Sequence, residues 1–309
     1  MSELSQQLEA YLRLRRSLGH GLAEAARLLP RFVTFLEDGG AEFVTLEAAL
    51  AWSLEPEAPA GSTVWGKRMT VVRGFARYLS GIDPRTEVPP AGAIPTPRRW
   101  RPPFIYSEAD IVALMEEARR SIPQPLRAAT FETLIGLLAA TGLRVGEALR
   151  LDRRDVDFGD GVLSVRESKF GKSRQVPLQP SVLRALQSYA ARREELCPHP
   201  RSESFFVSLR GTRVIYACVR PTFRMLCEGA GVGVGAPHRP RIHDLRHTFA
   251  VRALLCWYRE GLDVGARLPW LSTYLGHREP RYTYHYLSAA PELLEHAARL
   301  LEHDEAVGS

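Results

Sequence analysis

The sequence contains very little lysine. Of its 41 basic residues only Lys67, Lys169 and Lys172 are lysines, and all the others are arginines. A GC-rich coding sequence replaces lysine with arginine wherever either residue serves, so a lysine that remains is a candidate for a function that arginine cannot perform. The four cysteines form no CxxC pair, which argues against both a zinc finger and a disulfide framework.

Long apolar segments are also missing. No apolar run approaches the roughly 18–20 residues that a membrane-spanning helix requires, and the first residues, MSELSQQ, resemble no signal peptide. We therefore expect a cytoplasmic protein without a membrane partner. The acidic residues do not cluster as a two-metal nuclease would need, and we expect neither a metal site nor another cofactor.

The length, composition and net charge are typical of a folded, mildly basic protein. A length of 309 residues, with 45% hydrophobic and 25% charged residues, suits two globular domains of ordinary size. A net charge of +6 modestly favours a polyanionic partner.

The first 83 residues are expected to form a helical domain. Apolar residues at helical spacing predict four helices, at 4–19, 22–37, 45–54 with Thr45 as N-cap, and 62–79. In the last of these an apolar stripe of Val64, Val71, Val72, Phe75 and Tyr78 predicts the core face. Its basic side, with Lys67, Arg68 and Arg73, is either a solvated face or a DNA contact.

Residues 84–104 are rich in proline and arginine, which predicts an extended, stiff linker. Arg98, Arg99 and Arg101 either keep this linker soluble or lie along a phosphate backbone.

A second domain is expected over residues 105–309, mainly helical with a small antiparallel sheet. Ser107 caps the first of three helices, at 107–120, 128–140 and 143–151. Short strand-like runs follow at 156–158, 162–169 and 175–178, and helices resume from Ser181 to the end. The last of them, at 291–303, is amphipathic.

Residues 242–286 carry the strongest chemical signal. They contain His243 and Arg246, then His277 and a group of three tyrosines, a set that could bind an anion and attack it. Upstream, Arg144 begins a helix, where backbone N–H groups already favour an anion. Taken alone, Arg144 could equally be a surface residue or an ion-pair partner of Glu147.

Read together, these stretches resemble the tyrosine recombinase, or phage integrase, family, including recombinases carried by mobile elements. The matching motifs are TGLRVGE (141–147), SKFGKSRQVPL (168–178), HDLRHTFA (243–250), LGH (275–277) and YTYHYL (282–287). In that family the nucleophilic tyrosine lies nine residues beyond the last histidine, which selects Tyr286 over Tyr282 and Tyr284. The family pattern also prefers Lys169 over Lys172 as the catalytic lysine.

The residue types fit a phosphodiester transesterification. The forks of Arg144 and Arg246 suit the non-bridging phosphate oxygens, and Tyr286 can attack the phosphorus. His243 is suited to accept the phenolic proton, while Lys169 can protonate the leaving oxygen, which arginine cannot do. The remaining assignments are His277 as a phosphate ligand, Glu147 as a support for Arg144, and Lys172 and Arg174 as DNA contacts.

The resemblance implies a site-specific recombinase with a core-binding and a catalytic domain that close as a C-shaped clamp on double-stranded DNA. It further implies a homotetramer on DNA, with or without partner recombinases, and a 3′-phosphotyrosyl intermediate. The C-terminal helix could dock on its own domain or on a neighbour. A bacterial protein of the nucleoid is expected. The alternatives are a type IB topoisomerase and a non-cutting DNA-binding accessory of a mobile element.

Overall fold

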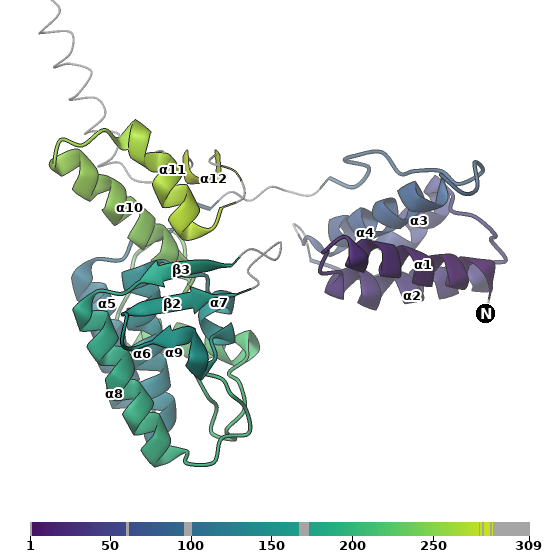
Figure 1. Ribbon diagram of the computed structural model, residues 1–309. Helices are drawn as coiled ribbons and strands as arrows, with labels where there is room; N and C mark the ends of the chain where they lie inside the picture. Colours follow the sequence, from purple (N-terminus) through teal and green to yellow (C-terminus); the bar gives the residue numbers. More distant parts are fainter. Residues whose placement is uncertain are drawn as a thin grey trace, which may run out of the picture. The chain divides into compact units, whose positions relative to one another are not determined.

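The computed structural model describes residues 2–59, 62–95, 101–166, 173–277, 279, 281–284 and 286. The chain divides into two compact units, Met1–Trp100 and Arg101–Ser309, each with its own hydrophobic core (Figure 1). The described elements are helices with one three-stranded antiparallel sheet, which confirms the predicted fold class. No helix among these residues is long and apolar enough to cross a membrane.

Four helices make up the first unit: α1 (Glu3–Ser17), α2 (Ala23–Asp38), α3 (Leu46–Leu54) and α4 (Val64–Leu79). The hydroxyl of Thr45 accepts a hydrogen bond from the backbone N–H of Ala48 at 3.1 Å, which confirms the predicted N-cap. Phe32, Trp52 and Phe75 are almost fully buried where these helices meet. Their burial supplies much of the apolar area that stabilises the unit.

The buried face of α4 differs from the predicted one. Arg68, expected on the basic side, is 6% exposed, whereas Val64, expected in the core, is 42% exposed. The guanidinium of Arg68 lies 3.6 Å from the ring centroid of Trp52 and pairs with Glu55 at 2.9 Å. Because its charge is used inside the unit, the expected DNA contact through Arg68 is wrong.

The segment 84–95 is not a free tether. The backbone N–H of Glu87 donates to the carbonyl of Val44 at 2.8 Å, and the carboxylate of Glu87 accepts from the N–H of Leu46 at 2.6 Å. Ile94 packs against the core of the first unit. The predicted linker therefore begins too early, since its proline-rich first half is fixed to the helices that precede it.

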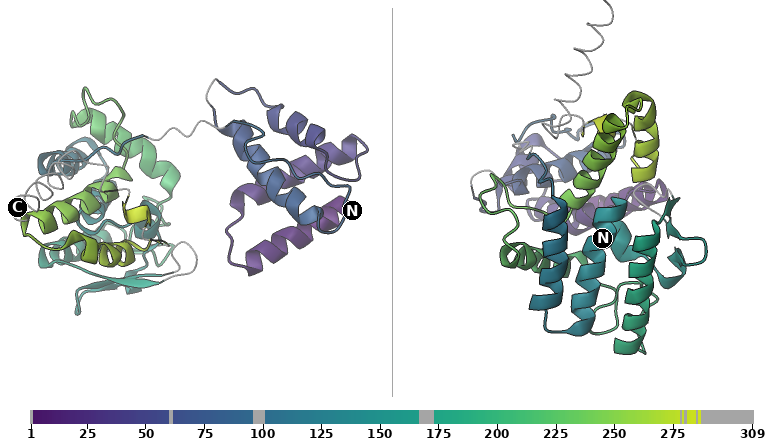
Figure 2. Two further views of the ribbon diagram at one scale, coloured as in Figure 1. Left: turned by 90° about the horizontal axis from the view of Figure 1, so that it is seen from above. Right: turned by 90° about the vertical axis from the view of Figure 1, so that its left-hand side faces the viewer.

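The second unit contains the remaining elements. In chain order these are α5 (Glu108–Ser121), α6 (Pro125–Thr141), α7 (Val145–Arg150), η1 (Arg153–Asp155), β1 (Val156–Asp157), β2 (Val162–Val165), β3 (Arg174–Pro177), α8 (Pro180–Leu196), α9 (Tyr216–Gly229), α10 (Asp244–Arg259), α11 (Val264–Leu275) and α12 (Arg281–Tyr284). The side chain of Ser107 caps α5 as predicted. Helices α5, α6 and α8 run side by side (Figure 2) and α10 also packs on α6, which is buried along most of its length.

The sheet has the strand order β1-β2-β3, and Val165 of β2 pairs with Arg174 of β3. Helices are expected from Ser181 to the end, but the chain between α8 and α9 is not helical. Residues 197–215 instead form irregular chain with two isolated bridges, and they place Phe205 and Phe206 in the core. Pro198 and Pro200 explain the interruption, since neither supplies a backbone N–H to a helix.

Two glycines in left-handed conformation end the helices that lead into the motifs at 141–147 and 275–277. Gly142 follows α6 with φ 61°, and Gly276 follows α11 with φ 68°. A Cβ atom at Gly142 would lie 2.5 Å from the ring of Phe249 on α10. Glycine therefore permits both the left-handed turn and the close approach of α6 and α10.

Gly142→Ala is expected to destabilise the second unit more than Gly261→Ala does. Gly261 has φ 67° and no neighbour within 4 Å of an added Cβ, so alanine there meets only the left-handed strain of about 1–2 kcal/mol. Alanine at Gly142 adds a steric overlap that costs about 1–3 kcal/mol more. Thermal unfolding of the full chain measures the difference, and equal losses in the two variants would contradict it.

Candidate active site

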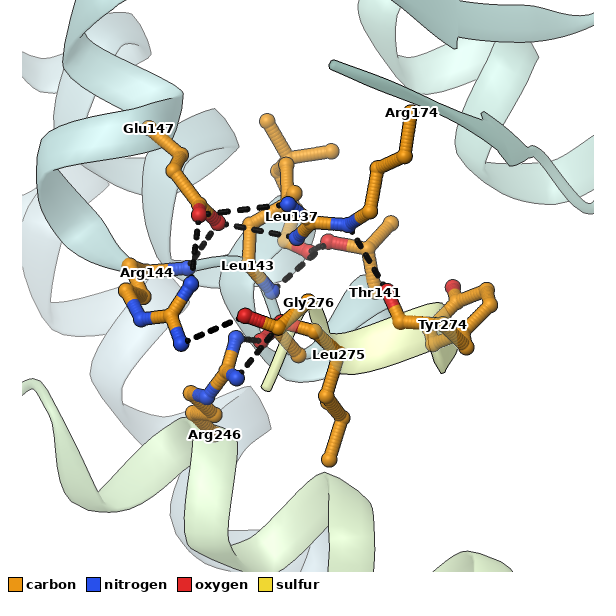
Figure 3. A network of polar contacts seen from close by, with 11 residues as sticks. Leu137, Thr141, Leu143, Arg144, Glu147, Arg174, Arg246, Tyr274, Leu275 and Gly276 are labelled. Carbon is orange, nitrogen blue, oxygen red and sulfur yellow. Dashed lines mark hydrogen bonds and ion pairs between the residues drawn. The ribbon is translucent and has the colours of Figure 1, made fainter. Parts of the chain in front are cut away.

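The carbonyl end of α11 is where the candidate residues converge. The carbonyl oxygens of residues 274, 275 and 276 accept hydrogen bonds from Arg174 Nε (2.7 Å), Arg246 Nη2 (2.7 Å) and Arg144 Nη2 (3.0 Å), in that order (Figure 3). The last carbonyls of a helix have no partner within the helix, and they carry partial negative charge. One helix end thus fixes three arginines that come from distant parts of the sequence.

Glu147 sits between two of these arginines. Its carboxylate accepts hydrogen bonds from the backbone N–H of Arg144 at 3.0 Å and from Arg144 Nη1 at 2.8 Å. It also accepts bonds from both Nη atoms of Arg174, at 3.2 and 2.9 Å. Burial alone would raise its pKa, but Arg174 and then Arg144 outweigh burial and lower the pKa of Glu147 to about 2. The carboxylate is therefore ionised.

Arg174 does not occupy the DNA-contacting position expected from the sequence. Its side chain is 13% exposed, and its guanidinium is directed at Glu147 and at the carbonyl of Tyr274. In the described structure, the donors of this side chain are used inside the unit. In the sequence, Glu147 lies one helical turn after Arg144, and this acidic residue could have indicated an internal ion-pair partner for Arg174.

Arg246 lies deepest of the three. It is 2% exposed, and its Nη1 donates to the carbonyl of Gly142 at 2.8 Å. Burial first, and then the charge of Arg144, lower the pKa of Arg246 to about 10, so the guanidinium is still protonated at neutral pH. Its positive charge also interacts with the phenol of Tyr286.

Tyr286 is enclosed, whereas the neighbouring Tyr284 is not. Tyr286 is 3% exposed and Tyr284 is 51% exposed. The Tyr286 ring lies 5.3 Å from that of His247 and 6.0 Å from that of His277, centroid to centroid. Burial raises the pKa of the phenol, although Arg246 and Arg144 act in the opposite direction. Of these two tyrosines, only Tyr286 reaches the arginines.

His277 directly follows the left-handed glycine at the end of α11. Its Nδ1 lies 2.8 Å from the hydroxyl of Thr283, which is fully buried. Burial, followed by the charges of Arg246, Arg144 and Arg174, lowers the pKa of His277 to about 3. The ring is therefore neutral at physiological pH.

His243 and His247 lie one turn apart at the start of α10. The side chain of His243 reaches solvent, and partial desolvation followed by the charge of Arg246 lowers its pKa. Its ring lies 5.2 Å from the ring of His247, which in turn lies beside Tyr286. The structure therefore places His247 next to the candidate nucleophile. Its spacing of four residues from His243 is the signal that could have indicated this.

Several other candidate residues are not among the described members of this cluster. Lys169, Lys172, Arg98, Arg99 and the segment 291–303 are outside the described residues. Lys67 is exposed on α4 and Arg101 is exposed at the start of the second unit. Arg73 is half-buried and donates to the carbonyl of Pro90 at 3.4 Å. Among the described residues, no three His, Cys, Asp or Glu side chains are grouped so as to hold a metal ion.

The assembled cluster is suited to bind an anion beside a phenol. Three arginines face a single ionised carboxylate and neutral histidines, so positive charge is in excess. Among the three arginines of this cluster, Arg144 has the most exposed side chain, at 26%. A phosphate approaching Arg144 would lie next to Tyr286, whose phenol interacts with the charges of both Arg246 and Arg144.

The comparisons with known proteins agree with this geometry. Residues 105–292 match the model of the phage integrase family, which is more than half of the chain. The chain belongs to the phage integrase family. Its members are tyrosine recombinases, enzymes that cleave and rejoin DNA strands. This integrase-family chain is 41% identical over 309 residues to y4rB of Sinorhizobium fredii, which is described as an integrase/recombinase, with 98% of each chain covered.

Further relatives support the same family. The tyrosine recombinase XerD of Pseudomonas aeruginosa is 32% identical over 256 residues, which covers 80% of this chain and 77% of XerD. The Tn1549 transposon integrase in complex with transposon right end DNA superimposes with a TM-score of 0.63 at 17% identity, over 96% and 98% of the two chains. XerH bound to its difH substrate gives a TM-score of 0.59 at 19% identity, over 83% and 71%. At these identities, the two structural matches concern the fold.

His277→Gln is expected to weaken the acid sensitivity of this integrase-family fold. In the unfolded chain, His277 takes up a proton below about pH 6.5, whereas in the folded state it does so only near pH 3. The unfolded state therefore binds more protons between these values, and stability falls as the pH falls. Protonation of Glu147 lowers the stability further only below about pH 4.5.

Thermal unfolding between pH 6.5 and 4.5 measures this contribution. The melting temperature of His277→Gln should fall less than that of the wild type, and His199→Gln, which alters an exposed histidine, serves as the control. Parallel curves for His277→Gln and the wild type would contradict the assignment.

Proposed function

We propose that the cluster around the end of α11 is the transesterification site of a site-specific DNA recombinase of the integrase type. The observation that carries the proposal is the position of Tyr286. Its phenol is buried and interacts electrostatically with Arg246, and Arg246 shares the α11 carbonyl end with Arg144. The nucleophile and the phosphate ligands thus belong to one protein chain.

In this proposal, Arg144 and Arg246 bind the non-bridging oxygens of the scissile phosphate. Negative charge builds on these oxygens as the pentacoordinate transition state forms, so fixed guanidinium groups stabilise that state more than the ground state. The hydrogen bonds to α11 support this assignment, because they hold both arginines in place before DNA arrives. Neutral His277 donates a hydrogen bond to the same phosphate without adding charge.

Tyr286 then attacks the phosphorus through its phenolic oxygen. A bond forms between this oxygen and phosphorus, the bond from phosphorus to the 5′ oxygen breaks, and the 3′ phosphate stays on the tyrosine. Neutral His243 accepts the phenolic proton; its lowered pKa supports this role, and the ring of His247 contacts both residues. Rejoining is the reverse reaction, with a 5′ hydroxyl as the nucleophile.

The departing 5′ oxygen needs a proton, and we assign its delivery to Lys169. The assignment is supported by the chemistry of lysine, which can give up a proton near neutral pH when its surroundings lower its pKa, whereas arginine does not. The same reasoning keeps Glu147 away from the phosphate, since a carboxylate there would repel it.

DNA binding is assigned to both units. We propose that residues 1–83 form the core-binding domain, and that exposed Lys67, the half-buried Arg73 and exposed Arg101 contact phosphates, together with Arg98, Arg99 and Lys172. The enzyme would act on the bacterial nucleoid in the cytoplasm, as a tetramer that joins two DNA sites. The C-terminal segment would dock either on its own domain or on a neighbouring subunit.

Tyr286→Phe is expected to abolish the covalent protein–DNA adduct and to leave the Kd for DNA within about threefold, because phosphate contacts dominate affinity. Duplexes are first selected from a random pool by binding to the Tyr286→Phe protein, and then nicked near the cleavage point to trap the adduct. Tyr284→Phe, at an exposed position of the same segment, is the matched control and should keep full adduct formation.

Three outcomes would contradict the proposal. An adduct on Tyr284 or Tyr282, located by peptide mass spectrometry, would move the nucleophile. Relaxation of supercoiled plasmid that lacks the selected sequence would indicate a type IB topoisomerase. Failure of the wild type to form any adduct on the nicked, selected duplexes would indicate a non-cutting accessory protein.

A further inference from the structure

We infer that Arg174 is a positioning residue of the recombinase site, which acts on the phosphate-binding Arg144 through the carboxylate of Glu147. This inference rests on the function proposed above, and it assigns a role to a third arginine that does not itself need to touch DNA.

The contacts of Arg174 link three separate elements. From β3, its Nε donates to the carbonyl of Tyr274 in α11, and its two Nη atoms donate to the two carboxylate oxygens of Glu147 in α7. Glu147 is 2% exposed, so these bonds form in an environment with little competing water. Figure 3 shows the guanidinium between the carboxylate and the end of α11. Arg174 therefore holds α7 and α11 at a fixed separation.

Each oxygen of Glu147 is shared between the two arginines. Oε1 accepts from Arg144 Nη1 at 2.8 Å and from Arg174 Nη1 at 3.2 Å. Oε2 accepts from the Arg144 backbone N–H at 3.0 Å and from Arg174 Nη2 at 2.9 Å. Without Arg174, the buried carboxylate would have Arg144 as its only charged partner among these groups. The pair would then tighten, and Arg144 would present less positive charge to a phosphate.

The site requires an arginine at position 174 rather than any cation. The side chain uses three N–H groups in two directions, along Glu147 and toward Tyr274, and only a planar guanidinium offers this fork. It also lies close to the backbone of Gly276, where an added Cβ atom would come 2.8 Å from Arg174 Nη1. Lysine would supply a point charge but could not make both sets of contacts.

The test uses the full-length protein and the duplex selected with Tyr286→Phe, prepared as a nicked suicide substrate. Under single-turnover conditions, Arg174→Lys and Arg174→Met should slow adduct formation by roughly 10²-fold, the size expected for a catalytic group displaced by about 1 Å. The Kd for DNA should stay within about threefold of the wild-type value, since phosphate contacts elsewhere dominate binding. Arg213→Lys is the matched control.

Arg213 resembles Arg174 in its bonding but lies outside the cluster. Its Nη2 pairs with Asp152 at 2.6 Å, and its Nη1 donates to the carbonyl of Leu149 at 2.9 Å. If both arginines have only a structural role, Arg213→Lys and Arg174→Lys should therefore change stability and cleavage rate alike. If both variants melt lower by similar amounts but only Arg174→Lys loses cleavage rate, the positioning role is supported. An unchanged cleavage rate in Arg174→Met overturns it.

Two further experiments test whether Arg174 acts through Glu147. The double variant Arg174→Met/Glu147→Gln should recover part of the rate lost in Arg174→Met, because a neutral amide no longer draws in Arg144. A duplex with sulfur in place of the bridging 5′ oxygen needs no proton on its leaving group. This duplex should not restore the cleavage rate of Arg174→Met. Full restoration of the rate would show that Arg174 acts on leaving-group protonation instead.

Failure of this inference is distinguishable from failure of the proposed function. If the wild type forms no adduct on any selected duplex, the proposed function falls and the inference falls with it. If the wild type and Arg213→Lys cleave while the Arg174 variants cleave equally well, only the inference is overturned.

Discussion

The unsatisfied carbonyl oxygens at the end of α11 are the constraint around which the site is arranged. A helix must find donors for its last carbonyls, and here arginines from α10, β3 and the start of α7 supply them. The arginines in turn obtain fixed positions without needing DNA. The same hydrogen bonds therefore complete the helix and preorganise a set of cations, which is the condition for stabilising a charged transition state.

Concentrating three arginines creates a repulsion that Glu147 relieves. Its carboxylate is buried and lies between two of the guanidinium groups, so it stabilises the cluster while leaving positive charge in excess. The histidines contribute no additional charge, because burial and the neighbouring arginines lower the pKa of both His243 and His277. The cluster can thus be stable before it binds an anion and still attract one.

The sequence predicted most of the fold, because its signals there are local. Helical spacing, the N-caps at Thr45 and Ser107, and the helix-ending Gly142 and Gly276 depend on a few adjacent residues. The predictions that failed depend on distant contacts: Arg68 lies on Trp52 of another helix, and the segment 84–95 is held by the backbone before α3. No local pattern encodes such partners.

The same distinction explains which site residues could be recognised. Motif spacing selected Arg144, Arg246, His277 and Tyr286, and these lie together in the structure. The sequence predicts Arg174 as a DNA contact, but in a chain with almost no lysine, arginine serves both for exposed charge and for buried, directional hydrogen bonding. Composition does not distinguish these two uses, whereas the hydrogen-bonding partner of an arginine in the structure does. A guanidinium whose donors are used by a buried carboxylate and a helix carbonyl shapes the site from within, and its neighbour Arg144 remains to meet the phosphate.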